Sequence, residues 1–404
     1  MKACGLVVEY NPFHNGHLHH LNEAKRLSGA DCIIAVMSGS FLQRGEPAVI
    51  DKFHRTRAAL LSGADLILEL PFPYAVQSSE LFAKGAVQTL HAAGADSLCF
   101  GSESGHTEGF IQAYTIRKEK AVLYQEVFRE QLNTGLSFPE ANRKAYEAIG
   151  LAQGVVDFSK PNNILGYSYV REILDNALPM RPFTIPRTKS GYHDKEITGS
   201  IASATSIREK LLTSGMLTAE INQAIPEATV HELQHYKETA GLWHGWEPYF
   251  QLLQYKILTA DPEALKRFHG VEEGLEHRII QTARKADSMD TWLRLMKTKR
   301  YTWTRIQRTF VHILAGTTKT AMDELRRNAG VSYIRVLGMN RTGRMYLNKT
   351  KKNIDVPLLT RIHEMDDPVL RLEQNASRAY YSILEAGKRL RFFEQELKGP
   401  VIIE

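Results

Sequence analysis

Short apolar runs alternate with longer segments of mixed polarity through the first hundred residues. The apolar runs are continuous, as expected for strands buried on both faces of a parallel sheet, and they are Ala3–Val8, Cys32–Met37, Leu66–Leu70 and Ser97–Phe100. The segments between them have the length and spacing of helices, and they are Leu18–Ser28, Asp51–Ser62 and Ser79–Ala93. This alternation predicts an α/β fold, with a Rossmann-like parallel sheet and helices on both of its faces.

The pattern becomes mostly helical after the fourth apolar run. Residues 106–150 are charged and helical in character, and Pro161 opens a further helix. Arg181–Ile185 resembles a fifth strand. A helix over Ser203–Ser214 follows, and Gly215 is a typical signal for its end.

Beyond Gly215 the chain is helical apart from a strand-like segment at Ser332–Leu337, and it ends in one long helix over Asp367–Leu397. A length of 404 residues suits two or three domains. We therefore expect residues 1–215 to form the sheet domain and residues 216–404 to form a second, mostly helical domain.

Composition excludes several classes of protein. Hydrophobic residues at 43% and charged residues at 24% are ordinary for a globular chain and argue against disorder. The three cysteines, Cys4, Cys32 and Cys99, form no CxxC pair, which argues against a disulfide framework or a structural zinc site. No apolar run reaches the ~18–20 residues that span a bilayer, and the N-terminus reads as a strand rather than a signal peptide. We expect a cytoplasmic protein without a membrane partner.

The strongest candidate for chemistry is His14-Asn15-Gly16-His17, between the first strand and the first helix. A glycine allows the backbone to approach a phosphate, and the free N–H groups of a helix start attract an anion. Histidines on either side can donate hydrogen bonds to a phosphoryl group as charge develops on it. Histidines at a helix start also cap it or face solvent, so the motif by itself leaves a purely structural role open.

A second candidate follows the last predicted strand of the sheet domain. Ser203, Thr205 and Arg208 lie at a helix start, where they offer hydroxyls, backbone N–H groups and a bidentate guanidinium to phosphate. Alone, this pattern fits an ordinary N-cap followed by a surface arginine. Together with the histidine motif in one α/β domain, it favours a nucleotide site at the carboxyl ends of the strands.

These two motifs resemble those of the HIGH-type nucleotidyltransferase superfamily. The runs 5–17 and 37–48, together with Lys160–Asn163, Gly274–Glu276 and Thr298–Tyr301, are similar to the bacterial tRNA(Met) cytidine acetate ligase family. The resemblance implies that acetate and ATP form acetyl-adenylate, and that the acetyl group passes to N4 of the wobble cytidine of elongator tRNA(Met). This sequence differs from class I aminoacyl-tRNA synthetases, because it has no lysine-rich second signature. Its phosphate contacts should therefore resemble those of the small nucleotidyltransferases.

The resemblance also implies a set of site residues. The catalytic candidates are His14, His17 and Arg208. The ATP-binding candidates are Val7, Glu9, Asn11, Phe13, His14, Gly16, His17, His20, Gly101, Asn162, Arg187, Thr188, Ser203 and Thr205. Mg²⁺ is expected on the pyrophosphate, although no carboxylate cluster in the sequence identifies its ligands and no metal-binding residue is assigned.

Positive charge is concentrated in residues 291–352, which contain 15 Lys and Arg but only two acidic residues, whereas the whole chain carries +6. A helix over Tyr301–Leu314 would place Arg305, Arg308 and His312 opposite its apolar side. Phosphate-rich RNA suits such a surface, although a solvated basic face is the simpler alternative. The candidate tRNA-binding residues are Lys297, Lys299, Arg300, Arg305, Arg308, Arg326 and Arg327.

Three other functions remain open at this point. His231, Glu232 and His235 match the HExxH pattern of zinc hydrolases, although the following residues lack the further ligand spacing of metzincins. A nucleotidyltransferase that moves AMP onto a small phosphorylated acceptor would use the same first domain. A non-catalytic RNA-binding protein would need neither nucleotide motif, and both motifs are intact.

Overall fold

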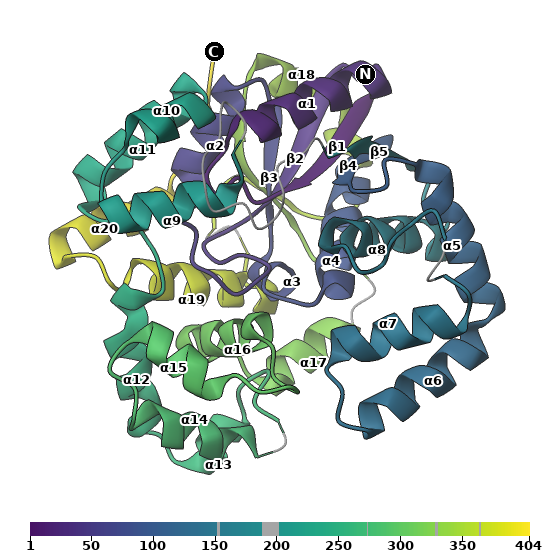
Figure 1. Cartoon of the computed structure of the whole chain (residues 1–404). Helices are drawn as coiled ribbons and strands as arrows, with labels where there is room; N and C mark the ends of the chain where they lie inside the picture. Colours follow the sequence, from purple (N-terminus) through teal and green to yellow (C-terminus); the bar gives the residue numbers. More distant parts are fainter. Residues whose placement is uncertain (152–153, 188–201, 273, 328–329, 363–364) are drawn as a thin grey trace.

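The computed structural model (Figure 1) describes residues 1–151, 154–187, 202–272, 274–327, 330–362 and 365–404. Within these ranges one sheet has the strand order β5-β4-β1-β2-β3-β6-β7, with β8 paired to β6. The first five strands are parallel, namely β1 (Ala3–Val8), β2 (Cys32–Ser38), β3 (Leu66–Leu70), β4 (Ser97–Ser102) and β5 (Arg181–Pro186). The predicted α/β fold with a Rossmann-like parallel sheet is confirmed.

The helices of the first half follow the predicted order closely. Their bounds are α1 (Asn15–Ser28), α2 (Lys52–Leu61), α3 (Phe72–Ala75), α4 (Ser79–Ala92), α5 (Thr107–Glu119), α6 (Ala121–Asn133), α7 (Phe138–Ala148), α8 (Pro161–Asp175) and α9 (Ala204–Ser214). Helix α1 begins three residues earlier than predicted, because His14 acts as its N-cap. Gly215 ends α9 in the left-handed conformation at φ 69°, as its position in the sequence indicated.

Both faces of the sheet are covered, and the alternation of strand side chains explains how. Ile33 on β2 belongs to a core with Leu21 of α1 and Phe53 of α2. Its neighbour Ile34 belongs to the core on the opposite face, which includes Phe82 of α4. Successive side chains of a strand point to opposite faces, so a strand between two helical layers must be apolar throughout. All seven residues of β2 are buried.

The second half of the chain contributes a further group of helices. Their bounds are α10 (Ala219–Ala224), α11 (Glu227–Ala240), η1 (Glu247–Tyr249), α12 (Phe250–Leu258), α13 (Pro262–Lys266), α14 (Leu275–Ala283), α15 (Met289–Met296), α16 (Trp303–Ala315) and α17 (Lys319–Arg327). Helices α12 to α16 share their own core, in which Trp292 is fully buried and packs on Phe310. In the described part of the chain, no helix combines the length and the apolar character needed to cross a bilayer.

The chain then returns to the sheet, which the sequence did not indicate. Strand β6 (Ile334–Met339) pairs antiparallel with β3, and β7 (Leu358–Leu359) and β8 (Val401–Ile402) extend the sheet from β6. Helix α18 (Arg341–Thr350) and the short η2 (Lys351–Asn353) lie between these strands. The sheet therefore crosses the expected boundary at residue 215. The helices α10 to α17 lie between α9 and β6 in the chain, and they pack in part against the sheet domain, as α11 does on α2.

The single long helix predicted at the C-terminus is wrong. The structure has two helices there, α19 (Pro368–Tyr381) and α20 (Ala386–Leu397), separated by four residues that include the buried Leu384. Helix α19 packs on α3 and α16, whereas α20 packs on α11. The chain turns between the two helices because each packs against different partners. The apolar spacing within each helix does not indicate where this turn falls.

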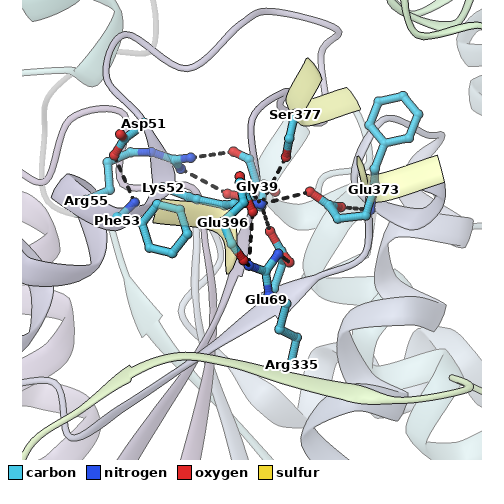
Figure 2. Close-up of polar contacts among 12 residues, drawn as sticks. Gly39, Asp51, Lys52, Phe53, Arg55, Glu69, Arg335, Glu373, Ser377 and Glu396 are labelled. Carbon is cyan, nitrogen blue, oxygen red and sulfur yellow. Dashed lines mark hydrogen bonds and ion pairs between the residues drawn. The ribbon is translucent and has the colours of Figure 1, made fainter. Parts of the chain in front are cut away.

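A buried network of charged side chains joins the two halves (Figure 2). The Nζ atom of Lys52 lies 2.6 Å from Glu69, 3.2 Å from Glu373 and 3.0 Å from Glu396. Arg335 reaches Glu69 at 2.9 Å and Glu396 at 3.0 Å. These five residues come from α2, β3, β6, α19 and α20, so the network ties both C-terminal helices to the sheet.

The charge balance of this network depends on one proton. Burial and the neighbouring Glu69 carboxylate raise the pKa of Glu373 to about 8, so Glu373 is protonated near pH 7. Two cations then face two anions. A side chain at Gly39 would enter the same space, since its Cβ would lie 2.8 Å from Glu373 Oε1.

Replacing Lys52 with methionine tests the contribution of the network to stability. Lys52→Met leaves buried carboxylates without their main partner, so we expect the free energy of unfolding to fall by ~3–5 kcal/mol in urea titrations. The matched control is Arg26→Met, which removes an exposed pair with Glu23 and should cost at most ~1 kcal/mol. Equal stabilities of the two variants would contradict this account.

Candidate active site

The histidine motif forms the first turn of α1. As the N-cap, His14 accepts the Gly16 N–H at Nδ1 over 3.0 Å, and His17 accepts the His14 N–H at Nδ1 over 3.3 Å. The two rings stack with centroids 3.7 Å apart. Since both Nδ1 atoms accept hydrogen bonds, each neutral ring carries its hydrogen on Nε2. The capping role and the functional role are therefore compatible, because capping leaves Nε2–H free for a ligand.

Burial keeps these histidines neutral. It lowers the pKa of His14 to about 3, with Arg187 and Arg208 adding to the effect, and it lowers the pKa of His20 to about 4. Burial, with the neighbouring His14 and Arg187, also holds the pKa of His17 well below its usual range. A neutral imidazole donates a hydrogen bond without the cost of burying a full charge. These rings are suited to stabilise charge that develops on a ligand.

The second motif lies beside the first, as expected for two motifs of one nucleotide site. Arg208 on α9 donates to the Asn11 carbonyl at 3.0 Å and pairs with Glu46 at 3.0 Å. Ser203 is the N-cap of α9 and accepts the Ser206 N–H at 3.1 Å. Ser203 therefore caps the helix. Arg208 connects the loop of residues 9–14, called here the histidine loop, to the loop that contains Glu46.

Most of the predicted nucleotide residues surround one cavity of about 1140 Å³. The lining residues among them are Val7, Glu9, His14, Gly16, His17, His20, Gly101, Asn162, Arg187, Ser203, Thr205 and Arg208. Two predicted contacts do not line it: Phe13 is buried in the core, and the side chain of Asn11 accepts the Val49 N–H at 2.7 Å. These two residues shape the loop from behind. Thr188 lies outside the described residues.

Polar contacts fix two predicted residues on the far side of the cavity. The Asn162 amide donates to Glu103 at 2.7 Å and accepts from Arg187 at 3.5 Å, and both Asn162 and Arg187 line the cavity. A Cβ at Gly101 would lie 3.3 Å from Cγ of Arg187. The glycine therefore makes room for Arg187, which lines the cavity beside it.

The basic stretch reaches this same cavity from the other half of the chain. Arg300, Arg305 and Arg308 line it, whereas Lys297 and Lys299 are exposed outside it. The cavity thus has one wall from the sheet domain and another from the helical part.

The polar side of α16 is only partly at the surface. Arg308 donates to the backbone carbonyls of Gln43 and Gln77, and the buried His312 donates to that of Val76 at 3.0 Å. The helix is amphipathic, as predicted, but polar residues on this side pack against loops of the sheet domain. The side chains of Arg326 and Arg327 lie outside the described part of the structure.

Comparison with known proteins identifies the family. The model of a family described as HIGH Nucleotidyl Transferase matches residues 1–395. The tRNA(Met) cytidine acetate ligase of Oceanobacillus iheyensis is 52% identical over 403 residues, with 100% of both chains covered. That of Bacillus subtilis is 45% identical over 399 residues, covering 98% of this chain and 96% of the relative. This chain belongs to the tRNA(Met) cytidine acetate ligase family.

Solved structures of the family agree with this assignment. The apo crystal structure of Thermotoga maritima TmcAL matches with a TM-score of 0.91 at 34% identity, covering 100% of both chains. A second form of that protein, bound with alpha-thio ATP, matches with a TM-score of 0.89 at 33% identity over the same full lengths. The resemblance that the sequence motifs indicated is therefore confirmed.

Membership of the acetate ligase family removes the zinc hydrolase alternative, and the geometry agrees. His231 is 73% exposed, and Glu232 is buried with its carboxylate 3.4 Å from Arg57. A hydrolase of this type needs two histidine ligands on the metal and an accessible glutamate as base. None of these three residues, His231, Glu232 or His235, lines the nucleotide cavity.

One residue that supports the site in this acetate ligase was missed by sequence reasoning. Arg55 is fully buried on α2 and donates to the carbonyls of Glu9 at 2.7 Å and Ser38 at 3.0 Å, and also to that of Gly39 (Figure 2). These carbonyls belong to the ends of β1 and β2, beside the cavity. An arginine in a helix carries no local signal of this role, because its partners are backbone atoms distant in sequence.

Removing the proposed phosphate donors tests the site directly. We expect His14→Ala and His17→Ala each to lower kcat of acetate-dependent ATP–pyrophosphate exchange by ~10²-fold or more, as for the loss of one oxyanion-hole donor. The control is His91→Ala, an exposed histidine at the end of α4 that does not line the cavity. Exchange within threefold of wild type in either site variant would contradict the assignment.

The lowered pKa values also predict a pH profile. With a pKa of about 3, His14 stays neutral from pH 5.5 to 8, so exchange should show no step near 6.5 from its protonation. Protonation, which removes the Nδ1 acceptor, sets in only as pH falls toward 3. Measurement of kcat across this range checks the prediction, and a His14-dependent loss near pH 6.5 would contradict it.

Proposed function

We propose that this protein joins acetate to ATP as acetyl-adenylate and then transfers the acetyl group to N4 of the wobble cytidine of elongator tRNA(Met). The observation that carries the proposal is the shared cavity, which brings the histidine loop and Arg208 together with Arg305 and Arg308. Its volume of about 1140 Å³ exceeds the ~300–1,000 Å³ typical of small-ligand pockets, which leaves room for a nucleotide and a second reactant.

In the first step, an acetate oxygen attacks the α-phosphorus of ATP and forms the new oxygen–phosphorus bond. The bond from the α-phosphorus to the oxygen that bridges it to the β-phosphate breaks, and pyrophosphate leaves with that electron pair. The protein positions the reactants and stabilises charge, since no covalent enzyme intermediate is needed. The Nε2–H groups of His14 and His17, with Arg208, are the donors assigned to the phosphates.

We propose that Mg²⁺ accompanies the ATP in this step. Glu9 and Glu46 line the cavity, but Glu46 is already paired with Arg208. Among the described residues, the one group of three side chains close enough to share a metal ion is His54, Glu232 and His235, and none of these lines the cavity. The donor set of the cavity fits an ion held mainly by phosphate oxygens and water, which is how Mg²⁺ commonly binds nucleotides. Bound there, it would neutralise charge on the leaving pyrophosphate.

In the second step, N4 of the cytosine attacks the acetyl carbonyl, the carbon–oxygen bond to AMP breaks, and N4 loses a proton as the amide forms. The cavity extends beyond the nucleotide residues to Tyr146, Phe158 and Tyr167, which provide an aromatic wall. Tyr146 and Phe158 stack on each other with ring centroids 4.3 Å apart, and Phe158 and Tyr167 belong to the core. We place the cytosine against this apolar wall.

The arginines on the opposite wall are suited to the phosphates of the tRNA. Burial, together with the nearby Arg305 and Arg44, lowers the pKa of Arg308 to about 10. Several positive charges crowd the same wall, and an anion between them relieves their repulsion. Lys297 and Lys299 extend the positive charge onto the surface. We propose the cytoplasm as the location, where acetate, ATP and tRNA are available.

The product of the complete reaction is the most direct test. Incubation with ATP, labelled acetate and elongator tRNA(Met) should yield labelled N4-acetylcytidine at the wobble position, measured by nucleoside mass analysis. His14→Ala should reduce this product by ~10²-fold or more. Transfer of AMP to a small phosphorylated acceptor, with no acetylcytidine, would favour the general nucleotidyltransferase alternative.

Charge reversal on α16 separates tRNA binding from acetate activation. Arg305→Glu should weaken tRNA affinity at least ~10-fold and lower the slope of log affinity against log salt by about 1. Acetate-dependent exchange should remain, since that step does not involve RNA. The matched control is Arg294→Glu on α15, which is exposed and does not line the cavity. Equal tRNA affinity of the two variants would refute the assignment.

A further inference from the structure

The HExxH segment lies on α11, which packs against α2 of the sheet domain. In the described residues, one group of three metal-ligating side chains has all its ligand atoms within 4.8 Å of one another, and it comprises His54, Glu232 and His235. His54 comes from α2 and takes the place that the sequence motif would give to His231. We propose that these three residues bind a zinc-like divalent cation that joins α11 to α2.

The distance between the two histidine nitrogens fits one metal ion. His54 Nε2 and His235 Nδ1 lie 3.3 Å apart. Two nitrogens bound to one tetrahedral zinc ion at ~2.0–2.1 Å lie about 3.3–3.4 Å from each other. Glu232 offers a carboxylate oxygen within 4.8 Å of both nitrogens, so a small rotation of its side chain on binding would give a His₂Glu set of the kind that zinc uses. His235 is exposed, so a water can take the fourth position.

The surroundings of the donors also match a metal site. Asp51 lies 2.8 Å from Nδ1 of His54, so the carboxylate holds the Nδ1–H tautomer and leaves the Nε2 lone pair toward His235. Arg57 lies 3.4 Å from Oε2 of Glu232 and fixes the other end of that carboxylate. Metal-bound histidines commonly have such a carboxylate behind them, and it sets both tautomer and ring orientation.

The site is distinct from the nucleotide cavity, which none of its three residues lines. Helix α2 also carries Lys52 of the buried network and Arg55, which holds the loop carbonyls. A cation between α2 and α11 would therefore fix the position of α11 against the helix that supports the site. Its role is structural, and acetyl transfer does not require it as a reactant.

Titration with Co²⁺ tests the proposal, because tetrahedral Co²⁺ has characteristic visible absorption and Zn²⁺ displaces it. The protein is the full chain without a histidine tag, freed of metal by a chelator. We expect about one equivalent bound, with His235→Ala lowering affinity at least ~10-fold and Glu232→Gln having a similar effect. The matched control is His231→Ala, an exposed histidine one turn before His235 whose Nδ1 lies 3.5 Å from Oε1 of Glu232. It removes this contact but no proposed ligand, so affinity should stay within about threefold of wild type.

Thermal unfolding provides the second readout. Zn²⁺ should raise Tm of the wild type and of His231→Ala, but not that of His235→Ala. Absence of Co²⁺ binding by the wild type would overturn the proposal, since a proton shared between His54 and His235 then accounts for their distance. Equal losses in His231→Ala and His235→Ala, or full binding by His235→Ala, would also overturn it.

Discussion

Lys52 lies where three glutamate side chains from distant parts of the chain meet, and the architecture around the active site depends on this buried network. Through Glu69, Glu373 and Glu396 it holds α19 and α20 against the edge of the parallel sheet. The next turn of α2 carries Arg55, which holds the backbone carbonyls at the ends of β1 and β2. Burying charge is favourable only when every partner is present, so the network links docking of the second half to the shape of the nucleotide loop.

In the candidate active site, neutral hydrogen-bond donors and positive charges come from different residue types. Buried histidines that accept backbone N–H groups at Nδ1 remain neutral donors at Nε2, and the positive charge at the cavity comes from arginines instead. Arg208 reaches the cavity from the sheet domain, and Arg305 and Arg308 reach it from the helical part. On the proposed function, these opposite walls hold the nucleotide and a phosphate of the RNA.

Much of the fold and part of the site could be predicted because their signals are local. The apolar runs indicated the strands, and Asp51 and Gly215 marked helix ends. Short motifs also picked out His14, His17 and Arg208, which line one cavity. The contacts that local patterns could not predict are long-range. Asn162 pairs with Glu103, and the polar side of α16 packs on loops of the first half.

The sequence by itself determined the α/β class, the family and the motif at the start of α1, since each rests on residue types at close spacing. Only the tertiary structure decided that the second half returns to the sheet as β6, that its arginines share a cavity with the histidine loop, and that His54 rather than His231 stands beside Glu232 and His235. Periodicity specifies which face of an element is apolar. It does not specify which distant element covers that face, because many partners of similar shape satisfy the same pattern.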